Sequence, residues 1–270
     1  MIKEIIQKNI KVIILFMTYT GFSNPENKDD IFNSTQIIIH QPLEKEAFDA
    51  KIQPLYFEDN KVEKVNIQGS PLLTSSQSNF DFLQYLPYDT SLKSLTLKNC
   101  GLTHKEANYI WEALRYNNLS LETLDLSQNP LTQQDASGSY NILGESFGPV
   151  IQKTETLREL YLNDLNLKDW RVNSISAAFT VNTTISILSL KSGKIDDLGA
   201  MQLSKMIMAN RTLQQLDLSN NNITKSGLKQ LMSSLKGNTK LKEINLKGNP
   251  ITKNDLYSLG FPSKNSVFIF

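Results

Sequence analysis

The sequence contains very little of what catalytic and metal sites are built from. It has one cysteine, Cys100, and two histidines, His40 and His104, which lie far apart in the chain. A single cysteine excludes an intrachain disulfide framework and a zinc site made of cysteines alone. A phosphate-binding Gly-rich loop and a His-Glu-x-x-His pattern are also absent. We therefore predict no catalytic residue, no metal and no cofactor, and a protein that is not an enzyme.

The sequence also lacks an excess of charge of either sign. Its 28 basic and 27 acidic residues give a net charge of +1 over 270 residues. No overall field therefore favours nucleic acid or anionic membranes. The 40% hydrophobic and 20% charged content is typical of a folded, soluble protein. We predict that the partner is another protein, that no nucleic acid is bound, and that the chain is a monomer.

The N-terminal segment, residues 1–24, has two interpretations. Three lysines precede the apolar run VIILFMTYTGF of residues 12–22, and Ser23 stands at a possible cleavage point, as in a signal peptide. The run is too short to span a membrane comfortably. The isoleucines of the whole segment also lie near helical spacing, which is typical of a capping helix. They are Ile2, Ile5, Ile6, Ile10, Ile13 and Ile14. The first interpretation predicts removal of residues 1–23 and a secreted or host-delivered protein without stable membrane insertion; the second predicts a cytoplasmic protein.

One apolar frame, Leu-x-x-Leu-x-Leu-x-x-Asn-x-Leu, recurs along most of the chain. LETLDLSQNPLT at residues 121–132 returns as LQQLDLSNNNIT at residues 213–224. Successive copies are 30, 29, 36, 28, 28 and 28 residues apart, beginning at Val62, Leu92, Leu121, Leu157, Ile185, Leu213 and Leu241. Such a fixed period indicates a stack of similar structural units.

Each unit combines two periodicities. Leu216 and Leu218 alternate with polar residues, which predicts a short strand with one buried face. Gly227, Leu231 and Leu235 then recur every four residues, which predicts a helix with one buried stripe. Neither element buries its apolar face alone, so copies must stack, with parallel strands lining a concave side and helices outside. We predict an α/β solenoid with about seven parallel strands.

An asparagine follows the strand in several copies, at Asn129, Asn221 and Asn249. Its amide can satisfy backbone groups that the bend leaves unpaired. Cys100 occupies the same position in the second copy, so we interpret it as structural and not as a nucleophile. The frame resembles leucine-rich repeats, and the 28-residue unit with a full helix resembles the ribonuclease-inhibitor type. The Lys-, Asn- and Ile-rich composition is similar to that of bacterial effectors.

The ends and one insertion depart from the frame. We predict an N-terminal cap at residues 25–61, repeats at residues 62–259, and a C-terminal cap strand at residues 260–270. The cap segments contain a strand-like run at 37–39 and the sequence SVFIF at 266–270. The long spacing after Leu121 places an insertion at residues 133–141, expected as a surface loop. It is either part of a binding edge or neutral.

The exposed strand positions supply the candidate binding residues. In the repeat frame they form two columns along the concave face. The first column is Asn66, Thr96, Asp125, Tyr161, Ser189, Asp217 and Asn245, and the second is Gln68, Lys98, Ser127, Asn163, Lys191, Ser219 and Lys247. Tyrosine is enriched among interface residues that dominate binding energy. We predict protein contacts by Tyr161, Asp125, Asp217, Lys191, Lys98, Asn163, Glu159 and Trp170.

The two tryptophans have different interpretations. Trp111 aligns with Leu231 on the helical stripe and is expected in the core. Trp170 stands at a rim position, where it either contacts a partner or packs on a neighbouring helix. His104 is expected at a loop or helix start.

The predicted function is a non-enzymatic binding module whose concave face grips a protein. The resemblance to the ribonuclease-inhibitor type implies that the partner is an enzyme that becomes inhibited. The alternative is an adaptor or effector that recruits a host protein to other machinery.

Overall fold

The computed structural model describes the backbone of most of the repeat region. The described residues are 35–40, 42, 45–56, 61–69, 83, 86, 91–115, 120–131, 143, 146–167, 170–260 and 267–270. The N-terminal segment, the insertion at residues 133–141 and the side chain of Trp170 lie outside them. The predictions made for these three features therefore stay predictions.

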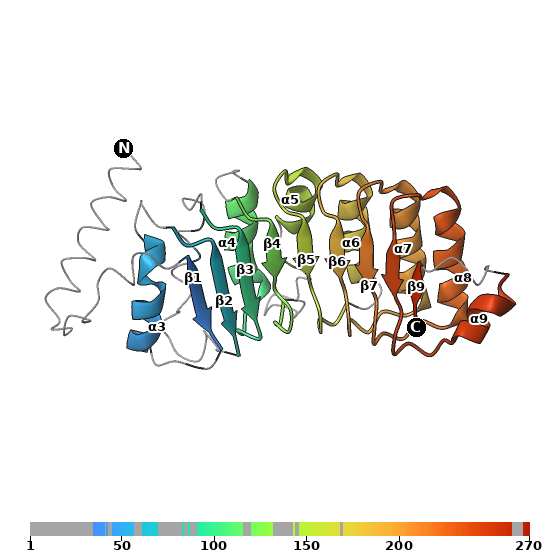
Figure 1. Cartoon of the computed structure of the whole chain (residues 1–270), viewed down its shortest axis with the longest axis horizontal. Coiled ribbons are helices and arrows are strands. Elements are labelled where there is room, and N and C mark those ends of the chain that lie inside the picture. The colour runs from blue at the N-terminus through green and yellow to red at the C-terminus, as the bar shows by residue number, and fades with distance from the viewer. Residues whose placement is uncertain are drawn as a thin grey trace, which may run out of the picture.

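The described residues form one parallel sheet in which sequence order and spatial order coincide (Figure 1). The strands are β1 (Gln36–Ile39), β2 (Lys64–Gln68), β3 (Ser94–Lys98), β4 (Thr123–Asp125), β5 (Glu159–Tyr161), β6 (Ile187–Ser189), β7 (Gln215–Asp217), β8 (Glu243–Asn245) and β9 (Phe268–Ile269). The strands number nine, where the repeat frame alone predicts about seven. The two additional strands are the runs noted at residues 37–39 and 266–270, which pair with β2 and β8.

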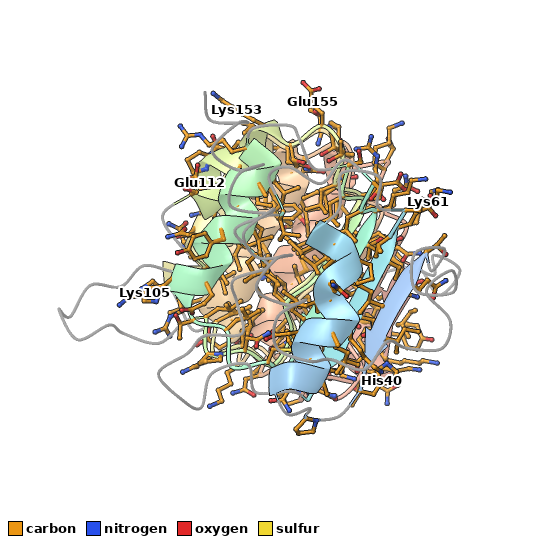
Figure 2. All side chains as sticks on the ribbon, turned by 90° about the vertical axis from the view of Figure 1, so that its left-hand side faces the viewer. His40, Lys61, Lys105, Glu112, Lys153 and Glu155 are labelled. Atoms are coloured by element: carbon orange, nitrogen blue, oxygen red, sulfur yellow. The ribbon has the colours of Figure 1, made fainter. Side chains whose placement is uncertain are left out.

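Helices cover one face of this sheet. They are α3 (Lys45–Ile52), α4 (His104–Arg115), α5 (Phe147–Lys153), α6 (Trp170–Val181), α7 (Asp197–Ala209), α8 (Lys225–Ser234) and α9 (Lys253–Ser258), with 3₁₀ turns at Gln53–Tyr56 and Leu235–Gly237. Seen from the N-terminal end, strands and helices form two layers with side chains filling the space between them (Figure 2). The other face of the sheet carries none of the described helices and is called the open face below.

The core lies between the two layers and follows the predicted alternation. Leu216 and Leu218 are almost completely buried, as is Leu231 on the helical stripe. The same positions recur in every repeat, so buried residues from β1 to β9 form one continuous cluster. The α/β solenoid predicted from the frame is therefore confirmed.

The asparagines after the strands do what the sequence predicts. The Asn221 Nδ2 donates to Leu190 O and Leu218 O at 3.1 and 2.9 Å, and its Oδ1 accepts from Ile195 N at 3.0 Å. Asn129 and Asn249 bond equivalent groups in their own and the preceding repeat. Each amide therefore joins two neighbouring repeats through buried backbone groups.

A second asparagine series joins the repeats at the other end of the unit. Asn182, Asn210 and Asn238 follow the helices, and each Oδ1 accepts from two backbone amides of its own turn. The Nδ2 of each donates to a carbonyl of the preceding repeat, at 2.5 to 2.7 Å. The regular spacing of 28 residues between these asparagines was a usable sequence signal that the leucine frame does not contain.

Close helix packing explains one glycine of the predicted stripe. A Cβ at Gly227 would lie 2.5 Å from Asp197 Oδ1 and 2.7 Å from Ile223 Cγ2. The Gly227 N–H donates to the same Asp197 oxygen at 3.0 Å, which joins the starts of α7 and α8. Only hydrogen fits at this contact.

We predict that Gly227→Ala lowers the free energy of unfolding by about 2 kcal/mol, because the added methyl overpacks the contact and displaces Asp197. Urea denaturation measures the change. Gly237→Ala is the matched control, since a Cβ there meets no atom within 4 Å. Equal stability of the two variants would contradict the close packing.

Candidate functional site: the open face of the sheet

The open face carries three rows of side chains that run across the strands. The middle row is Asn66, Thr96, Asp125, Tyr161, Ser189, Asp217 and Asn245, and the strand register pairs each member with the next. This is the first predicted column, residue for residue. Two residues earlier lies the amino-end row of Lys64, Ser94, Thr123, Glu159, Ile187, Gln215 and Glu243.

The second predicted column lies at the carboxyl ends of the strands and is called the carboxyl-end row. Gln68 and Lys98 are paired within β2 and β3. Beyond the later strands, the repeats remain in register through backbone bonds such as Gln128 N to Asn163 O, at 2.9 Å. Lys191 and Lys247 are exposed in this row, and Lys98 is half-buried. The frame therefore placed the middle and carboxyl-end rows. It did not predict the amino-end row, of which only Glu159 was among the predicted contact residues.

Tyr161 is held in place at the centre of the open face. Its hydroxyl donates to Glu159 Oε2 at 2.9 Å, within the same strand. Partial burial, this hydrogen bond and the negative charges of Glu159 and Asp125 together raise the pKa of Tyr161 to about 12. The phenol is therefore neutral at physiological pH, with its ring half-buried and its polar end directed to a carboxylate.

The raised pKa predicts a late-titrating tyrosine. Because the folded-state pKa is above the ordinary value of 10.0, the neutral phenol contributes stability below pH 10 that is lost as pH rises through 12. Tyrosinate ultraviolet absorbance during an alkaline titration should show one component near pH 12. Tyr161→Phe should remove that component alone, with far-ultraviolet circular dichroism monitoring the fold. Loss of a component near pH 10 instead would contradict the Glu159 contact.

The aspartates of the middle row each accept a hydrogen bond from the backbone of their own turn, in addition to carrying a negative charge. Asp125 Oδ1 accepts from Ser127 N at 2.9 Å, and Asp217 Oδ1 accepts from Ser219 N at 2.8 Å. Asn245 makes the same bond to Lys247 N, at 3.2 Å. An aspartate or asparagine at this position thus closes its own bend, so the two carboxylates are fixed in orientation.

Asn163 and the serines of the rows are less exposed than the column pattern suggests. Ser127, Ser189 and Ser219 are each at most 5% exposed. Asn163 Oδ1 accepts from Ser189 Oγ at 2.6 Å and from Lys191 N at 3.0 Å. Asn163 therefore links two repeats. This structural role explains an asparagine at the position without contact to a binding partner.

The remaining candidate residues are placed as the sequence predicts. Cys100 is fully buried and its thiol lies 3.4 Å from Ile67 O. Trp111 is fully buried and packs edge-on against Phe147, with ring centroids 5.3 Å apart. His104 is the first residue of α4 and is 7% exposed. These residues lie in or beside the core and not on the open face.

The prediction of no active site did not take one serine pattern of the sequence into account. Residues 144–148 read GESFG, which has the Gly-x-Ser-x-Gly spacing of a serine nucleophile. Ser146 Oγ donates to Glu112 Oε1. Glu112 lies eight residues along α4 from His104, about 12 Å of helix rise. The described residues therefore give Ser146 a carboxylate partner and no histidine base.

The described residues form neither a metal-binding cluster nor a membrane-spanning helix. They contain no group of three or more His, Cys, Asp or Glu side chains arranged to hold a metal ion. None of their helices combines the length and apolar character that crossing a membrane requires.

Family models match four of the repeat units. One described as "Leucine Rich repeat" matches residues 181–204, 209–232 and 237–260, and another, "Leucine Rich Repeat", matches residues 120–143. These four units of the chain are leucine-rich repeats. No curated protein sequence matches the chain.

Three solved structures are similar to this chain at low sequence identity. "Leiomodin-1 Actin-Binding Site 2" is 23% identical with a TM-score of 0.34, over 37% of this chain and 60% of that one. A Caenorhabditis elegans tropomodulin C-terminal domain is 21% identical with a TM-score of 0.38, over 43% and 72%. A Bacteroides fragilis protein is 15% identical with a TM-score of 0.48, over 84% and 69%. The chain therefore spans less than two thirds of the leiomodin-1 domain.

Proposed function

We propose that this leucine-rich-repeat chain binds another protein on the open face of its sheet, over β4 to β7. The observation that carries the proposal is Tyr161. It is the aromatic residue of the three rows, it lies at their centre, and Glu159 fixes its hydroxyl at 2.9 Å. A tyrosine held in one orientation supplies a large contact area with little loss of conformational entropy on binding.

The arrangement around Tyr161 supports the same surface. Asp125 and Ser189 flank it in the sheet register, and Asp217 lies on the strand beyond Ser189. Charged residues around an aromatic anchor raise the association rate and exclude wrong partners. Lys191, Glu159 and Asp217 complete this proposed contact set over β4 to β7, and Lys98 extends it to the end of β3. The contact set also includes Asn163, although its hydrogen bonds are structural. It includes Trp170 as well, the first residue of helix α6.

The partner and its face of contact can be identified together by photo-crosslinking. A photoreactive residue at exposed Gln215 on β7 should capture the partner in the cell that makes the protein. The same residue at exposed Gln230 on α8 is the control for the helical side. Capture from position 230 alone would move the binding site to the helices.

Tyr161→Ala should weaken binding of the captured partner by about 2 kcal/mol, or roughly 30-fold, if Tyr161 is an interface anchor. Isothermal titration calorimetry on the folded variant measures the loss. Tyr109→Ala is the matched control, because Tyr109 is 44% exposed on α4. Equal affinity of both variants and the parent would contradict the proposed anchor.

Activity measurements on the same complex distinguish two more specific functions, inhibition of an enzyme and recruitment of a partner. A partner that is an enzyme should lose activity in proportion to its occupancy if the chain is an inhibitor, as the ribonuclease-inhibitor resemblance suggests. The unit length of 28 residues with a helix of 13 residues, α7, supports assigning the repeats to that type. Full activity in the saturated complex favours an adaptor or effector that recruits its partner.

A further inference from the structure

The charges on the open face are segregated by row. Between β3 and β8, the amino-end and middle rows hold acidic side chains and no basic one. These acidic residues, called the acidic stripe, are Asp125, Glu159, Asp217 and Glu243. The carboxyl-end row holds basic side chains and no acidic one. These basic residues, called the lysine stripe, are Lys98, Lys191 and Lys247.

The two stripes do not neutralise each other. No ion pair involves any of these seven side chains in the described part of the chain, where the ion pairs are Lys93–Glu63, Arg115–Glu112 and Lys225–Asp255. Because the net charge is only +1, these local fields are not hidden in a strong overall field.

Two of the acidic side chains, and Tyr161 in the same middle row, are fixed before any partner arrives. The backbone amides of Ser127 and Ser219 hold one oxygen of Asp125 and of Asp217 without removing the negative charge. Glu159 is oriented by the Tyr161 hydroxyl. Carboxylates ordered in this way lose less conformational entropy when a cation approaches.

We propose that the partner lays one elongated segment across the strands, with a basic edge on the acidic stripe and an acidic edge on the lysine stripe. Both stripes run along the stack, so the segment follows its long axis over Tyr161. The acidic stripe extends over four strand spacings from β4 to β8, about 19 Å, and the lysine stripe over five from β3 to β8, about 24 Å. The longer stripe matches the length of roughly 16 helical residues. This inference rests on the proposed binding function and specifies the charge pattern of the partner.

The test uses two sets of neutralised variants with isosteric or near-isosteric side chains. The acidic-stripe variant carries Asp125→Asn, Glu159→Gln, Asp217→Asn and Glu243→Gln. Asparagine keeps the turn bond, as Asn245 shows with the same bond to Lys247 N. The lysine-stripe variant carries Lys98→Gln, Lys191→Gln and Lys247→Gln.

A third variant controls for the loss of charge elsewhere. It carries Glu112→Gln, Glu155→Gln, Lys205→Gln and Lys229→Gln, at positions outside the three rows; Glu112 and Glu155 are labelled in Figure 2. Circular dichroism melting should show that all three variants are folded before binding is measured.

The probes are fluorescent oligolysine and oligoglutamate peptides of about nine residues, which reach roughly 30 Å when extended. Anisotropy is measured in about 20 mM salt, where the Debye length is about 20 Å. Oligolysine should bind the acidic-stripe variant about tenfold more weakly than the parent and the lysine-stripe variant no more weakly. Oligoglutamate should show the reverse, and the control variant should bind both as the parent does.

A third probe tests the geometry. A helical peptide with lysines along one edge and glutamates along the other should bind more tightly than a peptide of identical composition with mixed edges. Absence of binding, equal losses in all variants, or equal affinity for the two helical peptides would each overturn the two-edged partner. Loss of partner affinity in Tyr161→Ala without any effect of the stripe variants would reject this inference and leave the proposed function standing.

Discussion

Leu218→Asp should unfold the sixth repeat together with its neighbours, lowering the free energy of unfolding by about 5 kcal/mol or more. Leu218 is fully buried in the continuous core, and its backbone carbonyl accepts from both Asn221 and Asn249. A carboxylate there has no water and no cation to stabilise it. Because each repeat is stabilised mainly by its neighbours, the damage should spread along the stack. Hydrogen exchange should detect lost amide protection from β6 to β8.

Gln215→Asp is the matched control for that prediction. Gln215 lies three residues earlier, in strand β7, with its side chain exposed on the open face. The same aspartate there should change stability by no more than about 0.5 kcal/mol. If Leu218→Asp unfolded at the same urea concentration as Gln215→Asp, the assignment of buried and open strand faces would be wrong.

Asn221→Ala should lower the free energy of unfolding by about 3 kcal/mol, since it strips partners from several buried backbone groups at once. Asn221 is 3% exposed and bonds Leu190 O, Leu218 O and Ile195 N. Alanine removes these bonds and admits no water to replace them. Thermal unfolding followed by circular dichroism should show the lower midpoint, and urea denaturation should give the free energy.

Asn222→Ala tests whether the buried amide is the cause. Asn222 is the next residue, its side chain is exposed, and its bond to Ile195 O uses the backbone N–H that alanine retains. Its removal should leave stability nearly unchanged. A cost as large as that of Asn221→Ala would assign the effect to the turn as a whole and not to the amide bonds.

The local pattern of the sequence determined the fold and the order of residues on the open face. A period of 28 residues fixes the repeated unit, and the alternation around Leu216 and Leu218 decides which side chains point to the core. Because every strand is parallel and in register, alignment of the repeats already placed Asp125 beside Tyr161. The structural position of Cys100 and the role of Asn221 follow from the same alignment.

Specific side-chain contacts, within a strand and between repeats, were decided by the tertiary structure. The Tyr161 bond to Glu159 depends on a rotamer, and the capping of Gly227 by Asp197 depends on how closely two helices approach. Neither is fixed by spacing along the chain. The second asparagine series is of the same kind, since Asn210 reaches Phe179 O in the previous repeat. Local pattern determines which way a side chain points, whereas the fit between neighbouring repeats determines which partner it meets.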